Sequence, residues 1–446
     1  MKKKYKVKKK YKILFSIIII IITGLSIITI LSKNEIKAVE YKGKQEDIIK
    51  KELIENIIIN TKDNNLTEDF LNWIYDNYKI DTLKKLNNYT INESYEEKIW
   101  HEITGNSYIV LKDLYTHKYD EAKNIKIIEK KGDITLSFVG DVSLADNWYI
   151  MPKYDERNKK IFGILSEDIV KIMTESDIMV ANSEFTISDR GEKMPGKYYT
   201  FRASPKRIPI YDEMGIDLLT LANNHVYDFG EIAFNDMIDA LNEYNMPYIG
   251  AGKNIEEAKR PYYFIINGYK IAFVNATRAE KLILTPEATN TTGGVFRCYD
   301  STNFKNLITD IKKESDYVIA LIHWGKEDSH SLEQVQIDTS KIYLDAGADI
   351  IIGSHAHVLQ GIEFYNNKPI IYNLGDFIFN NESKDTGILQ IKLSNEGTMS
   401  YYFIPAYESN EYTKLLYDKE KERVIKNMNN WSINAFIDNN GLIKEK

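Results

Sequence analysis

Six short apolar runs, each followed by polar residues, restrict the fold of this chain more than any other feature of its sequence. They alternate with stretches of helical periodicity, and this alternation is typical of an α/β domain in which helices cover a sheet. In open sheets of this kind the functional site lies beyond the carboxyl ends of the strands. The predicted strands are residues 134–139, 178–181, 218–222, 318–322, 350–352 and 370–372.

The segments between and after these runs fit the same architecture. Apolar residues recur at helical spacing over residues 231–244 and 332–346, which predicts two helices. Residues 270–274 have the composition of a further strand. Residues 388–393 and 400–404 alternate like strands on both sides of a turn that contains glycine, which predicts an antiparallel hairpin that extends the sheet.

Two histidines follow the fifth run. The apolar residues 350–352 lead into Gly353 and Ser354, after which His355 and His357 stand two positions apart. Alternate residues of an extended segment point to the same side, so the two imidazoles could face one site. Paired histidines at the end of a buried strand therefore indicate a metal site.

Ligand-type residues also stand at the ends of the other runs. The single cysteine, Cys298, excludes an intrachain disulfide and a cysteine-based zinc site, so a metal would be held by carboxylate, amide and imidazole groups. Such ligands suit Mn, Fe or Zn better than Mg or Ca when imidazoles take part. We expect one or two divalent ions, because a bridging carboxylate would let two ions share the site. The predicted ligands are Asp141, Glu184, Asn224, His323, His355 and His357.

Three further residues complete a hydrolytic interpretation. His225 could protonate a leaving group as a general acid, and Asp228, three residues later, could orient that histidine. Arg202 stands before a proline-bearing loop and could grip a carboxylate or a phosphate. An ordinary surface arginine is the alternative for Arg202.

Each candidate also has a purely structural interpretation. Asp141 and Glu184 could cap helices that follow them, and His225 and His323 could be hydrogen-bonded core histidines. Many ionisable groups at the ends of neighbouring strands, however, rarely converge without a functional reason. We therefore favour the functional interpretation of the set.

The N-terminal segment differs in kind from the rest of the chain. Residues 1–12 hold eight lysines and no acidic residue, and residues 13–32 are uncharged over a length that spans a bilayer as a helix. Lysines before such a span predict a cytoplasmic N-terminus and an extracellular main domain. We favour an uncleaved, single-pass anchor in the cell membrane over a cleaved signal peptide, because the apolar run is long and no small-residue cleavage site follows it directly.

Charge and periodicity divide the remainder. Without the eight lysines the net charge falls from −7 to −15, and so acidic a body argues against nucleic acid as a partner. Residues 33–45 form a polar tether, and residues 46–130 show helical periodicity without a catalytic cluster, which predicts a helical domain or stalk. The α/β domain covers residues 131–412, and a polar, charged tail follows at residues 413–446.

Taken together, the segments at the strand ends resemble a known family. The matching segments are Gly140-Asp141-Val142, Asn182-Ser183-Glu184, Ala222-Asn223-Asn224-His225 with Asp228 and Gly230, His323-Trp324-Gly325-Lys326-Glu327, Gly353-Ser354-His355-Ala356-His357-Val358-Leu359-Gln360 and Leu374-Gly375-Asp376-Phe377. The set is similar to the capsule and poly-γ-glutamate biosynthesis (CapA-like) family, which itself resembles the calcineurin-like metallophosphoesterases. The resemblance implies a four-layer α/β/β/α sandwich with its site at the strand ends. It also implies a membrane-anchored, outward-facing protein of surface-polymer assembly.

The chain departs from the wider phosphoesterase pattern in its first two motifs. Those enzymes usually carry Asp-x-His on the first strand, where this chain has Asp141-Val142-Ser143. Their second motif is usually Gly-Asp, whereas here Glu184 takes the place of the bridging carboxylate. One metal position therefore lacks an imidazole, and a full two-metal phosphoesterase does not follow from the resemblance alone.

Three functions remain open at this point. The first is a metal-dependent hydrolase of phosphoester or amide bonds that acts on an anionic surface polymer, with poly-γ-glutamate implied by the resemblance. The second is a non-catalytic subunit that organises polymer synthase subunits or guides a polymer outward, a role that the helical segment of residues 46–130 would suit. The third is a general surface metallophosphoesterase.

Overall fold

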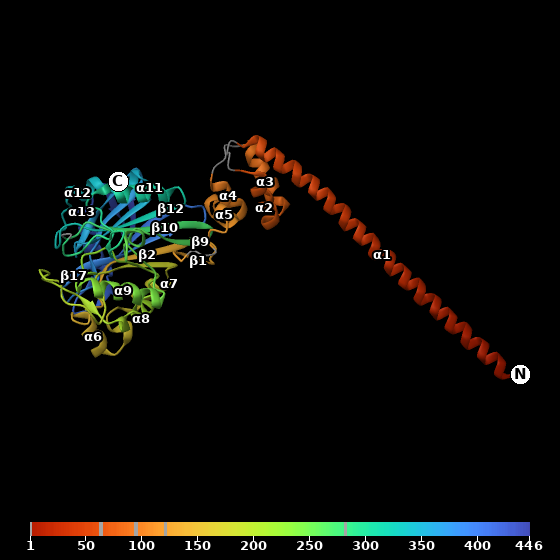
Figure 1. Ribbon diagram of the computed structural model, residues 1–446, viewed down its shortest axis with the longest axis horizontal. Helices are drawn as coiled ribbons and strands as arrows, with labels where there is room; N and C mark the ends of the chain where they lie inside the picture. The colour runs from red at the N-terminus through yellow and green to blue at the C-terminus, as the bar shows by residue number, and fades with distance from the viewer. Residues whose placement is uncertain (1, 62–65, 93–96, 120–122, 281–282) are drawn as a thin grey trace. The chain divides into compact units, whose positions relative to one another are not determined.

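The computed structural model describes residues 2–61, 66–92, 97–119, 123–280 and 283–446. The chain divides into two compact units, Met1–Thr104 and Gly105–Lys446 (Figure 1). The predicted boundary between helical segment and α/β domain, at residue 130, differs from this division. Residues 105–130 belong to the second unit, where they form a helix and a strand.

The first unit is helical, as the periodicity of its sequence predicts. Its described helices are α1 (Lys2–Asn60), α2 (Glu68–Tyr78), α3 (Ile80–Asn92) and α4 (Glu97–Thr104). Thr67 caps α2 by accepting a hydrogen bond from the backbone N–H of Phe70. Ile57, Ile74 and Trp100 come from three of these helices and are fully buried, so the recurring apolar residues form a small core.

The predicted membrane span cannot be matched to a described apolar helix. In the part of the chain that the structure describes, no helix combines the length and the apolar character needed to cross a membrane. The predicted span of residues 13–32 falls within α1, and the side chains of residues 13–24, 26 and 27 lie outside the described residues. The membrane anchor therefore stays a prediction.

The second unit contains two large sheets (Figure 1). The seven-stranded sheet consists of β1 (Ile125–Ile128), β9 (Tyr262–Ile266), β10 (Tyr269–Thr277), β12 (Tyr317–Trp324), β13 (Ile350–His355), β15 (Lys368–Leu374) and β14 (Leu359–Tyr365), in that order. The ten-stranded sheet runs through β20 (Ala435–Ile437), β21 (Leu442–Glu445), β18 (Met399–Glu408), β17 (Lys384–Leu393), β2 (Ile134–Val142), β3 (Ile178–Ser183), β6 (Leu218–Thr220) and β7 (Tyr248–Ile249), with β16 (Asp376–Ile378) on β2 and β19 (Thr413–Leu415) on β18. All six predicted strands and the predicted hairpin are confirmed, and the hairpin extends the sheet because β17 pairs with β2.

Alternating side chains explain why the two sheets pack against each other. In β3, Ile178 and Val180 enter a core that they share with Ile319 of the seven-stranded sheet. Met179, between them, joins the core on the opposite face. Because successive side chains of a strand point to opposite faces, every second apolar residue is assigned to the space between the sheets.

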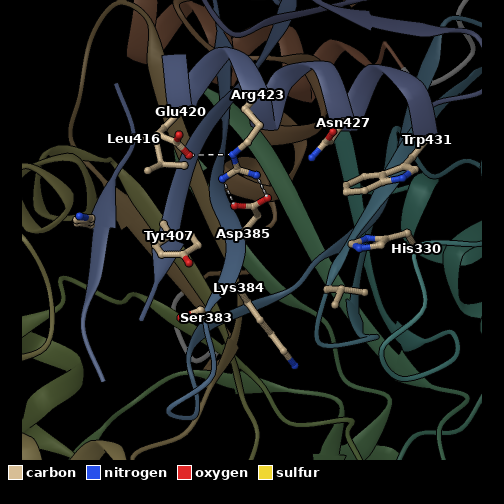
Figure 2. Close-up of a pocket in the computed structure, with 12 residues that line it drawn as sticks. His330, Ser383, Lys384, Asp385, Tyr407, Leu416, Glu420, Arg423, Asn427 and Trp431 are labelled. Atoms are coloured by element: carbon tan, nitrogen blue, oxygen red, sulfur yellow. Dashed lines mark hydrogen bonds and ion pairs between the residues drawn. The ribbon is translucent and has the colours of Figure 1, made fainter. Parts of the chain in front are cut away.

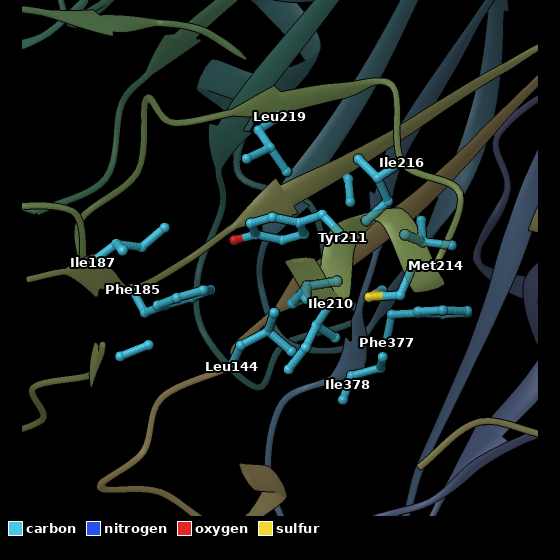
Figure 3. Close-up of a cluster of buried hydrophobic side chains, with 14 of the residues drawn as sticks. Leu144, Phe185, Ile187, Ile210, Tyr211, Met214, Ile216, Leu219, Phe377 and Ile378 are labelled. Carbon is cyan, nitrogen blue, oxygen red and sulfur yellow. The ribbon is translucent and has the colours of Figure 1, made fainter. Parts of the chain in front are cut away.

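Helices cover the outer faces of both sheets. On the ten-stranded sheet, α7 (Glu167–Glu175), α8 (Pro209–Glu213) and α9 (Gly230–Tyr244) share a core with the strands, where Tyr211 and Met214 lie close to Phe377 and Leu219 (Figure 3). On the seven-stranded sheet, α11 (Ser301–Lys312) and α12 (Gln334–Asp345) bury Phe304 and Tyr343. The predicted helices at residues 231–244 and 332–346 are confirmed, and the mixed α/β architecture with them.

Parallel pairing brings the carboxyl ends of the central strands to one edge of each sheet. Strands β2, β3, β6 and β7 run parallel, as do β10, β12, β13 and β15. The chain crosses from one sheet to the other at Gly375 (φ +70°), between β15 and β16, where Asp376 pairs with Asp141. A Cβ on Gly140 would stand 1.9 Å from the carbonyl oxygen of Gly375, so this crossing requires glycine at position 140.

The C-terminal segment, separated in the sequence as a polar tail, is folded into the second unit. Residues 413–446 form β19, α13 (Asp418–Trp431), β20 and β21. The helix α13 is strongly charged, but Val424, Ile425 and Met428 occupy one face and are buried in the core between the sheets. This narrow apolar stripe is easily overlooked in a charged sequence.

A buried ion pair attaches the start of the second unit to its sheet. Lys270 on β10 is fully buried, and its Nζ lies 2.7 Å from Oδ2 of Asp113 in α5 (Tyr108–Tyr115). The hydroxyl of Tyr119 donates a hydrogen bond of 3.0 Å to the same carboxylate, and Nζ of Lys270 lies 4.6 Å from the ring centroid of Tyr263. Residues 105–130 therefore belong with the α/β unit for an electrostatic reason that periodicity does not reveal.

Candidate metal centre

Strand ends from both sheets meet at one buried cluster of carboxylate and imidazole groups. Asp141 lies near the end of β2 and Glu184 directly after β3, both in the ten-stranded sheet. His323 and His355 lie at the ends of β12 and β13 in the seven-stranded sheet. All four side chains are buried, so the cluster is built where the two sheets face each other.

One oxygen of Glu184 is the centre of this cluster. Oε1 of Glu184 lies 3.4 Å from Nε2 of His323, 3.9 Å from Nε2 of His357 and 4.0 Å from Nε2 of His225. Among the described residues this buried oxygen has no hydrogen-bond partner. Two of these separations are well beyond hydrogen-bond length, whereas ligands about 2.0–2.2 Å from a tetrahedral ion stand about 3.4 Å apart. The arrangement therefore fits a divalent cation between the imidazoles and the carboxylate.

The candidate ligands form overlapping sets. In each set the ligand atoms lie within 4.8 Å of one another. The sets are Glu184 with His323 and His355, Asp141 with Glu184 and His357, and Glu327 with His355 and His357. Because Glu184 belongs to two of them, the geometry accommodates two ions that share one carboxylate.

His355 and His357 both reach the cluster, but through a local geometry that differs from the extended segment expected from the sequence. Their φ angles are +94° and +56°, both in the left-handed region. Non-glycine residues there are uncommon and concentrate at functional sites. The rings are 6.0 Å apart, and Nδ1 of His355 is buried without a hydrogen-bond partner in the described part of the chain. A tight turn, rather than strand alternation, aims the two imidazoles.

A carboxylate outside the predicted set orients His357. Nδ1 of His357 lies 2.7 Å from Oδ1 of Asp376 and 3.3 Å from Oδ2 of Asp141. An imidazole that donates its Nδ1–H to a carboxylate presents Nε2 to a metal, an arrangement common around metal-bound histidines. Although burial opposes the charged form, Asp376 and Glu184 raise the pKa of His357 well above its ordinary value.

Burial also perturbs the protonation of the other members. Burial, assisted by the negative charge of Asp141, raises the pKa of Glu184 well above its usual value. Burial and neighbouring imidazoles lower the pKa of His323 and of His355 well below the ordinary histidine value. These two imidazoles are therefore held in the neutral form, which is the form that binds a metal.

Two asparagines tie the carboxylates and imidazoles together. Nδ2 of Asn182 donates hydrogen bonds to Asp141 (2.8 Å) and to Glu184 (3.2 Å), and it lies 3.3 Å from Nδ1 of His323. Oδ1 of Asn224 lies 2.7 Å from Nε2 of His323. The predicted ligand Asn224 thus stands beside the cluster, where its carbonyl oxygen could face either the imidazole or an ion.

His225 and Asp228, predicted as a catalytic pair, are in direct contact. Nδ1 of His225 lies 2.8 Å from Oδ2 of Asp228, so Nε2 faces the cluster. Asp228 is fully buried and also accepts hydrogen bonds from Nζ of Lys197 (2.7 Å) and from the backbone N–H of Phe201 (2.7 Å). Lys197 is buried as well and lies 3.0 Å from Glu280. A carboxylate held by a cation and a backbone donor fixes the orientation of the histidine that it contacts.

Arg202 does not take part in the cluster. Its guanidinium lies over the ring of Phe229, 4.1 Å from the centroid, and Nη1 donates a hydrogen bond to the carbonyl oxygen of Gly191. The structure thus places this group on loop backbone and an aromatic face. Substrate binding by Arg202 stays a prediction.

Four residues join the site without having been predicted for it: Asn182, Lys197, Glu327 and Asp376. Asn182, Glu327 and Asp376 lie within segments that carry the resemblance, and only their roles were missing. Lys197 stands in a loop of Met-Pro-Gly-Lys type with no chemical pattern around it. Its burial beside Asp228 depends on tertiary contacts that sequence spacing does not encode.

Comparison with known proteins gives a family profile that matches more than half of the chain. A profile described as "Bacterial capsule synthesis protein PGA_cap" matches residues 135–381. A "PGA biosynthesis protein CapA" of Bacillus subtilis (strain 168) is 29% identical over 279 residues, which cover 61% of this chain and 71% of that protein. The matched region contains all the predicted ligands.

Two further similarities are weaker. A "Probable polyglutamine synthesis accessory protein" of Mycobacterium tuberculosis (strain CDC 1551 / Oshkosh) is 27% identical over 215 residues, which cover 46% of this chain and 56% of that protein. Among solved structures, a 5'-nucleotidase from Candida albicans SC5314 covers 62% of this chain and 52% of its own, with 14% identity and a TM-score of 0.35. Because this TM-score is low, the similarity does not support the assignment of the fold, which rests on the order and pairing of the strands.

Proposed function

Because the chain belongs to the family of bacterial capsule synthesis proteins described as PGA_cap, we propose that its second unit is a metal-dependent hydrolase-type domain that acts on an anionic surface polymer. The bond broken is a phosphoester or an amide, and poly-γ-glutamate is the polymer that the family suggests. The proposal includes a four-layer domain of metallophosphoesterase type. It also includes a membrane anchor at residues 13–32 that keeps this domain extracellular.

One observation carries the proposal. A fully buried carboxylate oxygen, Oε1 of Glu184, faces three imidazole nitrogens without accepting a hydrogen bond from any described residue. Leaving a buried acceptor unpaired costs about 1–3 kcal/mol, so a protein that keeps one has a use for it. Mn, Fe or Zn is the ion that this set of ligands suits.

The chain's own residues have separable roles in such a reaction. A divalent ion held by Asp141, Glu184, Asn224, His323, His355 and His357 would polarise a phosphoryl or carbonyl oxygen and activate water. His225 would act as the general acid that donates a proton from Nε2 to the leaving group, because the contact between its Nδ1 and Asp228 fixes the orientation of the ring. Asp376 keeps Nε2 of His357 directed at the cluster.

Elemental analysis with an activity assay tests the proposal. We expect the full-length protein to hold one or two equivalents of Mn, Fe or Zn and to cleave a phosphodiester or an oligo-γ-glutamate only when the metal is present. The double variant His355→Ala, His357→Ala should lose both properties while it keeps its circular dichroism spectrum. If the unaltered protein takes up no divalent ion after reconstitution, the hydrolase proposal fails.

Metal binding is expected to release protons and to strengthen as the pH rises. Because the pKa values of Glu184 and His357 are raised, the metal-free cluster keeps its protons to higher pH than ordinary carboxyl and imidazole groups do, and those protons must leave before the metal binds. Affinity should increase about tenfold per pH unit for each proton released. Calorimetric titrations in buffers of different ionisation enthalpy count these protons, and an affinity that stays constant between about pH 6 and pH 8 would contradict this assignment.

The alternative is a non-catalytic subunit of a polymer synthase. The Mycobacterium tuberculosis relative is named an accessory protein of synthesis, and the first unit of this chain lies outside the matched region. In that case the metal would be structural. Polymer production would then survive the His355→Ala, His357→Ala change in cells, whereas the hydrolase proposal requires that it change.

A further inference from the structure

A cavity lies beside the metal centre, in a part of the chain that the family profile hardly covers. It has a volume of about 690 Å³ and is lined by residues of α13, β17, β18 and β19 and of neighbouring loops. In Figure 2 Arg423 extends from α13 to Asp385, and Trp431, farther along the same helix, lies beside His330. Most of these lining residues follow residue 381, where the profile ends.

The acidic side chains of the lining are already paired. Arg423 binds Asp385 through two hydrogen bonds of 2.6 Å each, and its Nε lies 2.8 Å from Oε2 of Glu420. Lys414 is exposed at the same cavity and forms no ion pair with any residue that the structure describes. The cavity thus offers a free cation, while both of its carboxylates are engaged.

The rest of the lining combines hydrogen-bonding groups with apolar surface. Ser383, Tyr407 and Asn427 contribute hydroxyl and amide groups. Trp431 lies flat against His330, with ring centroids 3.9 Å apart and an angle of 9° between the planes. A ligand with methylene groups between its charges would satisfy both kinds of surface, whereas a compact inorganic anion would use only one.

Lys384 connects this cavity to the metal centre. It lines the cavity, and its Nζ lies 3.3 Å from Oδ2 of Asp376. Oδ1 of the same carboxylate lies 2.7 Å from Nδ1 of His357. Val358, which follows His357 in the chain, also lines the cavity. The cavity therefore lies next to residues that hold His357 in the metal centre.

We propose that this cavity is a second subsite, which binds a carboxylate-bearing residue of a flexible anionic chain next to the bond held at the metal centre. Lys414 pairs with the carboxylate, the hydrogen-bonding groups hold the linking amides, and the wall of Trp431 and Leu416 covers the methylene groups. This inference rests on the proposed function, to which it adds the residues that would select a carboxylate-bearing chain.

Binding of a synthetic oligomer of γ-linked glutamate to the full-length protein, measured by calorimetry, tests the subsite. We expect Lys414→Glu to weaken binding by about tenfold or more, because it replaces a charge-assisted contact with repulsion. Lys419→Glu is the matched control, since Lys419 is exposed near the start of α13 but does not line the cavity. An oligomer of γ-linked isoglutamine, in which an amide replaces each α-carboxylate, should not bind.

Metal content, measured on the same samples, separates this inference from the proposed function. Equal affinities of the Lys414→Glu and Lys419→Glu proteins, or equal binding of the isoglutamine oligomer, would overturn the subsite even if metal and turnover are present. Conversely, binding that depends on Lys414 in a protein without metal would support the subsite and refute the hydrolase. A change in tryptophan fluorescence on binding should disappear in Trp431→Phe, and its persistence would place the ligand elsewhere.

Discussion

Replacing Glu184 with glutamine is expected to reduce metal affinity by about 100-fold or more. Loss of a residue that only supports a metal ligand already costs up to about 100-fold, and loss of a ligand should cost at least as much. The amide has nearly the same shape, but it lacks the negative charge and turns either a neutral oxygen or an N–H group toward the ion. Glu184 belongs to two of the three candidate ligand sets, so its loss should affect both metal positions.

The same change should leave the metal-free protein as stable as before, or more stable. Burial already raises the pKa of Glu184, so the folded protein favours its neutral form, which glutamine imitates. Elemental analysis after dialysis, beside thermal unfolding, measures the two effects. Glu192→Gln, at an exposed position, is the control. If Glu184→Gln retains its full metal content, the cluster is not a metal centre built around this carboxylate.

Replacing Lys270 with methionine is expected to destabilise the second unit by up to about 3–5 kcal/mol, because the change removes the nearest counter-ion of the buried Asp113 carboxylate and leaves only Lys118 at 3.8 Å. The exposed Lys305→Met on α11 should stay within about 0.5 kcal/mol of the unaltered protein. Denaturant unfolding, followed by tryptophan fluorescence, to which Trp148, Trp324 and Trp431 of the second unit contribute, measures the difference.

A double change decides whether the ion pair is the cause. Asp113→Leu combined with Lys270→Met removes both charges and should recover a large part of the lost stability, because replacing a buried pair with apolar side chains is often neutral. If the double variant is no more stable than Lys270→Met alone, the loss comes from packing around Lys270 and the ion-pair explanation is wrong.

Much of the fold of the second unit follows from local sequence. The buried strands are short apolar runs bounded by polar residues, and the helices at 231–244 and 332–346 show plain periodicity, so both kinds of element could be located. The strand β1 and the helix α13 could not, because four residues such as Ile125–Ile128 carry little pattern and α13 hides three buried residues among charges.

The candidate site likewise contains residues that local sequence predicts and residues that it does not. Asp141, Glu184, His323 and His355 stand at strand ends, where parallel topology brings side chains together, so their convergence was predictable. Asp376 is not among the predicted site residues, because its role comes from a crossing between two sheets that no local sequence pattern indicates. The turn at His355 and His357 was mistaken for an extended segment because their left-handed backbone conformations are unusual for histidine.

The position of β2 has a consequence for how this protein is made. One neighbour of β2 is β3, some 40 residues later, but the other is β17, some 250 residues later, so Leu136 pairs with both Ile178 and Ile391. Forming contacts between residues so distant in sequence slows folding, because the intervening chain must first be brought together. During synthesis the part of β2 that pairs with β17, residues 134–138, keeps one edge unpaired until the ribosome has produced residues 384–393. An unpaired edge promotes association between nascent chains. A pause in translation before residue 384 should therefore increase aggregation, whereas a pause after residue 393 should leave aggregation unchanged.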